Sequence, residues 1–179
     1  MNATVQTGYF FMPEHIILVG ASERPHSLGE RIFSHLLGSS YQGKITPVNL
    51  RHSSVAGLPS YSSLSKIPGQ ADLVVAVIPH DHYDTLFKAC RKKGLRHIIL
   101  IQDWENLPPE SCKNARSIIQ KYHGDELNIT VCNSAGVQLP SLNLNIGTQA
   151  DYPAGHIALL TGHSTVSRNI NHLLNTMHQ

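Results

Sequence analysis

Short apolar runs that alternate with amphipathic helical segments are the strongest constraint on the fold of this chain. Several of these runs are rich in Ile and Val, lack polar alternation and are bounded by turn residues, which is typical of strands buried on both faces of a sheet. The predicted strands are Ile16–Val19, Lys44–Val48, Leu73–Ile78, Ile98–Ile101, Asn128–Cys132 and Ile157–Leu160.

Helical segments lie between these runs, with apolar residues at a spacing of three and four. The predicted helices are Glu30–Leu37, His82–Lys93, Pro109–His123 and Ser164–Met177. The segment Pro59–Gly69 is predicted to form a short helix or a turn, since it contains two prolines and many serines. Because strands and helices alternate, we predict an α/β fold, a Rossmann-like parallel sheet with right-handed crossovers and helices on both faces.

The length of 179 residues suits one domain with its own core. Turn residues gather in Leu139–Pro153, which indicates a linker. We therefore predict a Rossmann-like domain over residues 1–145, followed over residues 146–179 by a linker and the start of a truncated second unit.

The composition narrows the class of partner and the compartment. Hydrophobic residues make up 41% of the chain and the formal net charge is +2, so we expect a globular protein with no affinity for nucleic acid or membranes. No apolar run approaches the roughly 20 residues that span a bilayer. Cys90, Cys112 and Cys132 form no CxxC pair, which predicts buried or free thiols in a reducing compartment and favours a cytoplasmic location. No metal site is predicted.

The loop after the first predicted strand is the strongest candidate for a ligand site. In doubly wound sheets the ligand lies at the carboxyl ends of the strands, and a helix N-terminus attracts phosphate. Gly20 ends the first strand and Gly29 lies near the start of the helix. The loop between them also carries hydroxyl and basic side chains: Ser22, Arg24, His26 and Ser27. The alternative is that both glycines serve only a tight turn.

The details of this loop argue against NAD as the ligand. The GxGxxG fingerprint is absent, because Ser22 stands at the position of its second glycine and the loop is several residues too long. An NAD site also needs an acidic residue at the end of the second strand. Arg51 and His52 follow that strand instead, which favours a ligand with an extra ribose phosphate, either coenzyme A or NADP. A solvated loop with stray cations is the alternative.

The segments Phe11–Pro25 and Ser27–Gly29 resemble the opening of the CoA-binding domain of NDP-forming acyl-CoA synthetases. This superfamily includes the succinyl-CoA synthetase alpha subunit and ADP-forming acetate–CoA ligase, and the domain also occurs in bacterial protein lysine acetyltransferases. The resemblance covers nearly the whole chain from about residue 10. It continues through Gly43–Asn49, Val55–Leu58, Ala71–Pro79, Lys93-Gly94 and Pro153–Leu160, the last similar to the entry into the family's flavodoxin-like second domain.

This resemblance implies a site for coenzyme A or acyl-CoA along the ends of the strands. The loop after the first strand would hold the phosphates, the end of the second strand would flank the adenosine, and the loops after the fourth and fifth strands would line the pantetheine arm and the thiol. The implied contact residues are Gly20, Ala21, Ser22, Arg24, Pro25, Ser27, Leu28, Val48, Asn49, His52, Ile78, Pro79, Gln102, Asp103 and Asn133.

The chain also departs from the family pattern. Val131–Gly136 replaces the usual Gly-Pro-Asn, Thr161–Thr165 replaces Ser-Gln-Ser-Gly, and Thr165–Ile170 is closer to the acetyltransferase branch. Trp104 stands where many relatives have small residues.

Neither the family's phosphorylated histidine nor its ATP-grasp module can be assigned here, so no catalytic residue is predicted. The chain alone is not expected to complete acyl-CoA synthesis. A synthetase beta-type subunit or further domains would be its partners. The alternatives are an NADP-binding oxidoreductase domain, or a degenerate nucleotide-binding domain used for subunit contacts.

Overall fold

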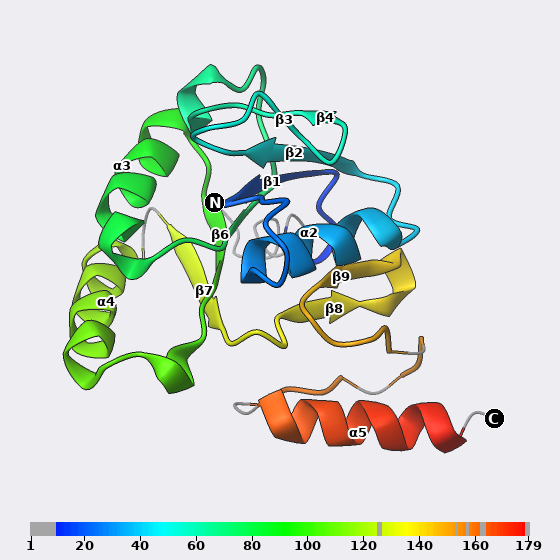
Figure 1. The fold of residues 1–179 in the computed structure, drawn as a ribbon. Helices are drawn as coiled ribbons and strands as arrows, with labels where there is room; N and C mark the ends of the chain where they lie inside the picture. The colour runs from blue at the N-terminus through cyan, green and yellow to red at the C-terminus, as the bar shows by residue number, and fades with distance from the viewer. Residues whose placement is uncertain (1–9, 125–126, 153, 157, 162–163, 178–179) are drawn as a thin grey trace.

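A five-stranded parallel sheet in the order β2-β1-β5-β6-β7 forms the centre of the computed structural model (Figure 1). The structure describes residues 10–124, 127–152, 154–156, 158–161 and 164–177. The strands are β1 (His15–Val19), β2 (Lys44–Val48), β5 (Leu73–Ala76), β6 (His97–Ile101) and β7 (Asn128–Cys132). The strand order reverses at β1, which lies between β2 and β5, so the predicted Rossmann-like α/β fold is confirmed.

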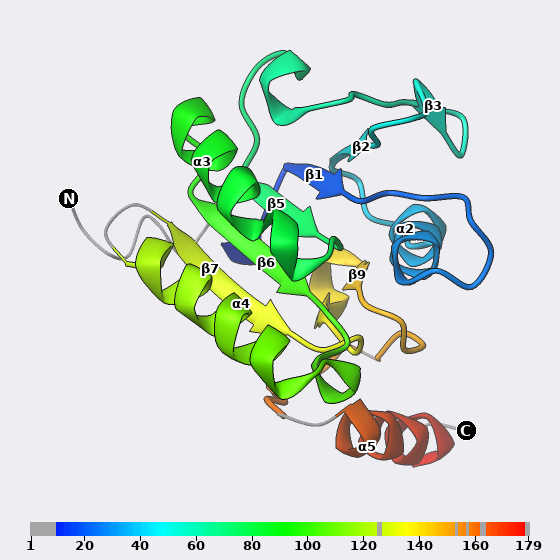
Figure 2. The same ribbon diagram turned by 60° about the vertical axis from the view of Figure 1, so that its left-hand side comes forward.

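Helices cover both faces of the sheet, as predicted. Helix α2 (Leu28–Gly38) lies on one face, while α3 (Tyr83–Lys93) and α4 (Pro109–Tyr122) lie on the other (Figures 1 and 2). The residues of β5 and β6 are fully buried between these layers, which explains their unbroken apolar runs. The third strand ends at Ala76, two residues earlier than predicted, because its pairing with β6 stops there.

The predicted linker Leu139–Pro153 is wrong over much of its length. Strands β8 (Val137–Leu139) and β9 (Leu144–Ile146) form an antiparallel hairpin that closes through η4 (Pro140–Leu142). The hairpin packs beside α2 and takes the place of a second helix on that face (Figure 1). Its strands have only three residues each, too few to show a period in the sequence.

The predicted sixth strand, Ile157–Leu160, is also wrong over residues 158–160, which belong to no sheet. Leu160 is fully exposed and Leu159 is 44% exposed, so this apolar run has no neighbouring strand to bury it. Ile157 lies outside the described residues. Helix α5 (Ser164–Met177) has the bounds predicted for the last helix.

The chain between β2 and β5 is irregular, as the short-helix-or-turn prediction anticipates. It contains a two-stranded hairpin of β3 (Ser54–Val55) and β4 (Leu58–Pro59), followed by η1 (Leu64–Lys66). Two further single turns, η2 (His80–His82) and η3 (Trp104–Asn106), precede α3 and α4. These turns carry the chain from the ends of β5 and β6 into the helices.

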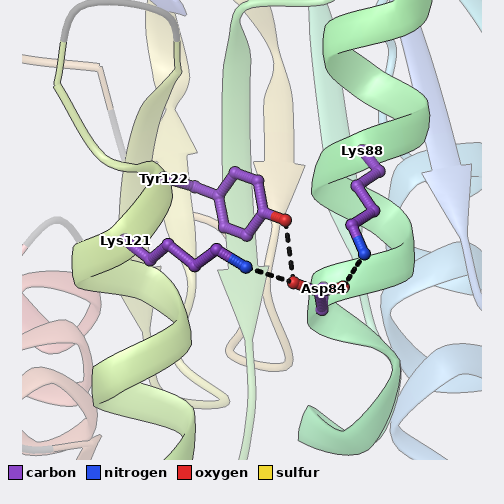
Figure 3. A network of polar contacts seen from close by, with 4 residues as sticks. All are labelled: Asp84, Lys88, Lys121 and Tyr122. Atoms are coloured by element: carbon purple, nitrogen blue, oxygen red, sulfur yellow. Dashed lines mark hydrogen bonds and ion pairs between the residues drawn. The ribbon is translucent and has the colours of Figure 1, made fainter.

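A polar network fastens α3 to α4 on the outer face of that layer (Figure 3). The Asp84 carboxylate accepts hydrogen bonds from the Tyr122 hydroxyl at 2.7 Å and from the Lys121 ammonium at 3.1 Å. It also forms an ion pair with Lys88, one turn along α3. The hydrogen bond from Lys88, then those from Tyr122 and Lys121, hold the pKa of Asp84 well below its usual range. None of the helices that the structure describes is long and apolar enough to cross a bilayer.

Candidate functional site

The strand register aligns the predicted contact residues along the carboxyl edge of the sheet. The Gly20 amide donates to the Val48 carbonyl oxygen at 3.1 Å, and the Val77 amide donates to the Val19 carbonyl oxygen at 2.8 Å. The loops after β1, β2 and β5 are therefore adjacent, and β6 and β7 continue the same edge. Every residue in the predicted contact set lies in one of these loops or directly beside it.

Gly20 and Gly29 bring β1, β5 and α2 into unusually close contact. A Cβ added to Gly29 would lie 2.2 Å from the Gly20 carbonyl oxygen. A Cβ added to Gly20 would lie 2.2 Å from the Val77 carbonyl oxygen, and Gly20 has a φ of +91°. Larger residues would force these backbones apart. The glycines thus do more than allow a turn, because they bring the N-terminus of α2 against the end of β1.

Local hydrogen bonds shape the loop between the two glycines. The Ser27 amide donates to the Arg24 carbonyl oxygen at 3.1 Å, with Pro25 second in the turn and His26 third at a φ of 63°, the pattern of a type II turn. The Ser22 hydroxyl accepts from the Arg24 amide at 3.0 Å.

Ser27 is the N-cap of α2, since its hydroxyl oxygen accepts from the Glu30 amide at 3.2 Å. The amides of Leu28 and Gly29 lie in the first turn, where a helix has no acceptor of its own for them. Both hydroxyl groups, those of Ser22 and Ser27, are hydrogen-bond acceptors here and keep a proton to donate. This end of α2 suits an anionic ligand.

Asn49 joins the loops after β1 and β2. Its amide nitrogen donates to the Ala21 carbonyl oxygen at 2.8 Å. Its side-chain oxygen accepts from the amides of Arg51 at 2.8 Å and His52 at 3.1 Å. The side chain predicted to flank the ligand therefore orders two loops of the protein, and it holds the backbone from which the exposed Arg51 and His52 side chains extend.

No pattern in the sequence indicates a second connection between the same two regions. The Glu23 carboxylate accepts a hydrogen bond from the Ala56 amide at 3.0 Å, across 33 positions of sequence. Ala56 and Gly57 form the turn of the β3–β4 hairpin, and both have positive φ values of 48° and 80°. In the sequence, this turn is indicated only by a small residue, Ala56, followed by Gly57.

At the ends of β6 and β7 side-chain hydrogen bonds join the loops, and glycine packing recurs only farther along the chain, where a Cβ on Gly136 would lie 1.8 Å from the Ile146 carbonyl oxygen. The Trp104 indole N–H donates to the Cys132 carbonyl oxygen at 3.0 Å, and the backbone N–H of Gln102 donates to the same oxygen at 3.2 Å. The Asp103 carboxylate accepts from the Asn106 amide nitrogen at 2.7 Å. The Asn133 side-chain oxygen accepts from the Ala135 amide at 3.0 Å.

The remaining predicted residues differ in exposure. Ile78 is half-buried against the core on the α3 side, whereas Pro79 is exposed. Burial raises the pKa of the Cys132 thiol to about 11, so at neutral pH this cysteine is a protonated, structural residue at the end of β7. In the described part of the chain, His, Cys, Asp and Glu side chains form no group of three suited to a metal ion.

A separate hollow lies at the opposite end of α2, between that helix and the β8–β9 hairpin. Its lining includes Gly38, Ser39, Gln138, Asn143, Asp151 and Tyr152. None of these residues belongs to the predicted contact set. The carboxyl edge, with its phosphate-compatible helix end, remains the candidate site.

A parallel sheet of this order, with a glycine-packed turn from β1 to α2, defines a Rossmann-like nucleotide-binding domain. A family model described as CoA binding domain matches residues 14–139. The chain therefore belongs to the CoA binding domain family, and the resemblance drawn from its sequence is confirmed. The predicted cofactor, coenzyme A, agrees with this membership.

Characterised relatives are longer than this chain. The alpha subunit of ADP-forming acetate–CoA ligase II from Pyrococcus furiosus is 30% identical over 155 residues, which cover 86% of this chain and 34% of the relative. The alpha subunit of ligase I from the same organism is 26% identical, over 75% of this chain and 30% of the relative. The chain thus matches about a third of their length.

Solved structures agree with the fold. A protein of Pyrococcus horikoshii OT3 superposes with a TM-score of 0.79 at 26% identity, covering 94% of this chain and 39% of that protein.

Proposed function

We propose that this chain binds coenzyme A or acyl-CoA along the carboxyl edge of its sheet, with the phosphates at the β1–α2 loop. The contact of Gly29 with the Gly20 carbonyl oxygen carries this proposal, because it presents the N-terminus of α2 at the edge where such sheets bind ligands. The hydroxyl groups of Ser22 and Ser27 and the guanidinium of Arg24 lie on the same loop and would supply further donors.

The rest of the ligand would extend in both directions from this loop. The adenosine with its 3′-phosphate would lie toward Val48, Asn49 and His52, where Arg51 adds a second basic side chain. The nucleotide would pass Ile78 and Pro79. The pantetheine arm would run past Gln102 and Asp103 toward Asn133, since the strand order places these loops in sequence along the edge.

We further propose that the chain serves as the CoA-binding part of an ADP-forming acyl-CoA synthetase of the acetate–CoA ligase type, acting in the cytoplasm. The two relatives described above are ligase subunits by name, which favours the ligase over the acetyltransferase branch. Since the match covers about a third of each, catalysis would need a beta-type subunit or further domains. Residues 146–179 would then lead into the second domain.

Calorimetric titration of the purified chain with CoA, acetyl-CoA, dephospho-CoA and NADPH tests this function. We expect CoA and acetyl-CoA to bind, dephospho-CoA to bind about tenfold more weakly through loss of one phosphate contact, and NADPH not to bind. Tighter binding of NADPH than of CoA would favour the oxidoreductase alternative. Absence of heat with every ligand, in a chain shown to be folded by circular dichroism, would favour the degenerate domain.

A further inference from the structure

We infer that Glu23 is a positioning residue that joins the β1–α2 loop to the β3–β4 hairpin, so that the two walls of the nucleotide site act as one surface. This inference rests on the proposed function, since it assigns a role within the CoA site. It adds a residue that binds no part of the ligand itself. The observation behind it is the hydrogen bond from the Ala56 amide to the Glu23 carboxylate at 3.0 Å.

The hairpin end of this connection is anchored in the core. Val55 is 1% exposed and packs in the cluster on the α2 side of the sheet, next to Ala56. The turn itself consists of Ala56 and Gly57, both with left-handed φ values, so the Ala56 amide lies at the tip of a two-residue hairpin turn. A carboxylate that accepts a hydrogen bond from this amide is therefore attached to a hairpin that the core holds in place.

The loop end of the connection is fixed on the other side by Asn49. The Asn49 side chain binds the Ala21 carbonyl oxygen, two residues before Glu23. The segment from Asn49 to Ala56 thus contacts the β1–α2 loop at both of its ends. Between the two contacts lie Arg51 and His52, the basic side chains proposed to meet the 3′-phosphate. Two connections constrain the relative placement of the two loops far better than one.

Charge gives a second reason for this assignment. A carboxylate in a loop that receives phosphates repels them, and the repulsion is largest when the carboxylate is free to turn toward the ligand. The bond to Ala56 gives the Glu23 carboxylate a partner on the hairpin. Glu23 therefore favours CoA binding by holding the two loops in place. This gain in binding free energy must exceed the cost of the repulsion between its carboxylate and the phosphates.

Three variants of the chain test this role: Glu23→Ala, which removes the acceptor, Glu23→Gln, which keeps an acceptor oxygen without charge, and Glu14→Ala as a matched control. Glu14 is exposed and precedes β1, at the opposite edge of the sheet. In the free protein, we expect amide exchange at Ala56, measured by NMR, to be about tenfold faster in Glu23→Ala and close to wild type in the other two.

Titration with CoA then tests the role in binding. We expect a Kd about five- to tenfold higher for Glu23→Ala, because the loops must be ordered on binding, and values within about twofold of wild type for Glu23→Gln and Glu14→Ala. Equal or tighter CoA binding by Glu23→Ala, with wild type binding normally, would overturn the inference. Failure of wild type to bind CoA would refute the proposed function itself, while the exchange rates would still report whether the bond exists.

Discussion

The two halves of the carboxyl edge are built differently. Where β1, β5 and α2 meet, backbones approach so closely that Gly20 and Gly29 leave no space for a Cβ. At the ends of β6 and β7, a large side chain, Trp104, reaches across and donates to the Cys132 carbonyl oxygen. The first half is therefore defined by backbone packing next to the sheet, whereas the ends of β6 and β7 are joined by a side-chain hydrogen bond. Backbone packing recurs only beyond that bond, where Gly136 meets the Ile146 carbonyl oxygen.

The two kinds of contact differ in how well they tolerate substitution. Backbone packing cannot adjust to an added atom without moving a strand, whereas a side-chain contact can be lost at the cost of one hydrogen bond. Phosphates, which need fixed N–H donors, are proposed to lie at the first half. The thioester end of an acyl-CoA, where the acyl group varies, is proposed to lie at the second half, at the ends of β6 and β7.

Gly29→Val should have the largest effect. The added Cβ would meet the Gly20 carbonyl oxygen at 2.2 Å, so the helix must shift away from the strand. We expect a loss of about 3 kcal/mol in unfolding free energy and a fall in Tm of roughly 10 °C, with loss of CoA binding. Differential scanning calorimetry measures the change. In the same helix, Gly38→Ala meets nothing within 4 Å and should leave Tm equal or slightly higher.

Asn49→Ala should rank second. It removes the donor to Ala21 and the acceptor for the amides of Arg51 and His52, at a cost of about 2 kcal/mol by urea denaturation. CoA affinity should fall with it. Asn49→Asp keeps the acceptor only, so an affinity as high as that of wild type in this variant would show that the bond to Ala21 is dispensable.

Trp104→Phe should have a smaller effect, because the ring remains and only the bond to the Cys132 carbonyl oxygen is lost. We expect about 1 kcal/mol in urea denaturation. The affinity for free CoA should stay near that of wild type. A loss of CoA binding comparable to that of Gly29→Val would contradict the proposed division between the two halves.

Asp84→Asn lies away from the edge and should have the smallest effect. Because the folded-state pKa of Asp84 is lowered, its ion pairs with Lys88 and Lys121 stabilise the fold at pH values above about 3.9, and this stabilisation is lost as pH falls further. The variant should melt below wild type at pH 7, and the gap should close toward pH 2. Its CoA binding should be unchanged. A gap in Tm that stayed as wide at pH 2 as at pH 7 would point to packing instead of charge.

Much of the fold could be predicted because its signals are local. The unbroken apolar run of β6 predicts a strand covered on both faces, and Ser27 caps α2 through an amide only three residues away. The location of the candidate site at the carboxyl edge followed from the predicted strand topology alone. The β8–β9 hairpin was missed because its strands are short, and residues 158–160 were mistaken for a strand because apolar composition does not reveal whether a neighbour exists.

The features of the candidate site likewise divide into those that local sequence signals predict and those that depend on the folded chain. The β1–α2 loop, its glycines and the basic pair after β2 could be predicted from the sequence, since these residues are close together in the chain and carry their own chemistry. The hydrogen bonds between Asn49 and Ala21, between Glu23 and Ala56 and between Trp104 and Cys132 are found only in the folded structure. Each of these bonds joins loops about 30 residues apart, and such pairings arise when the sheet brings strand ends together, which no local pattern of residues records.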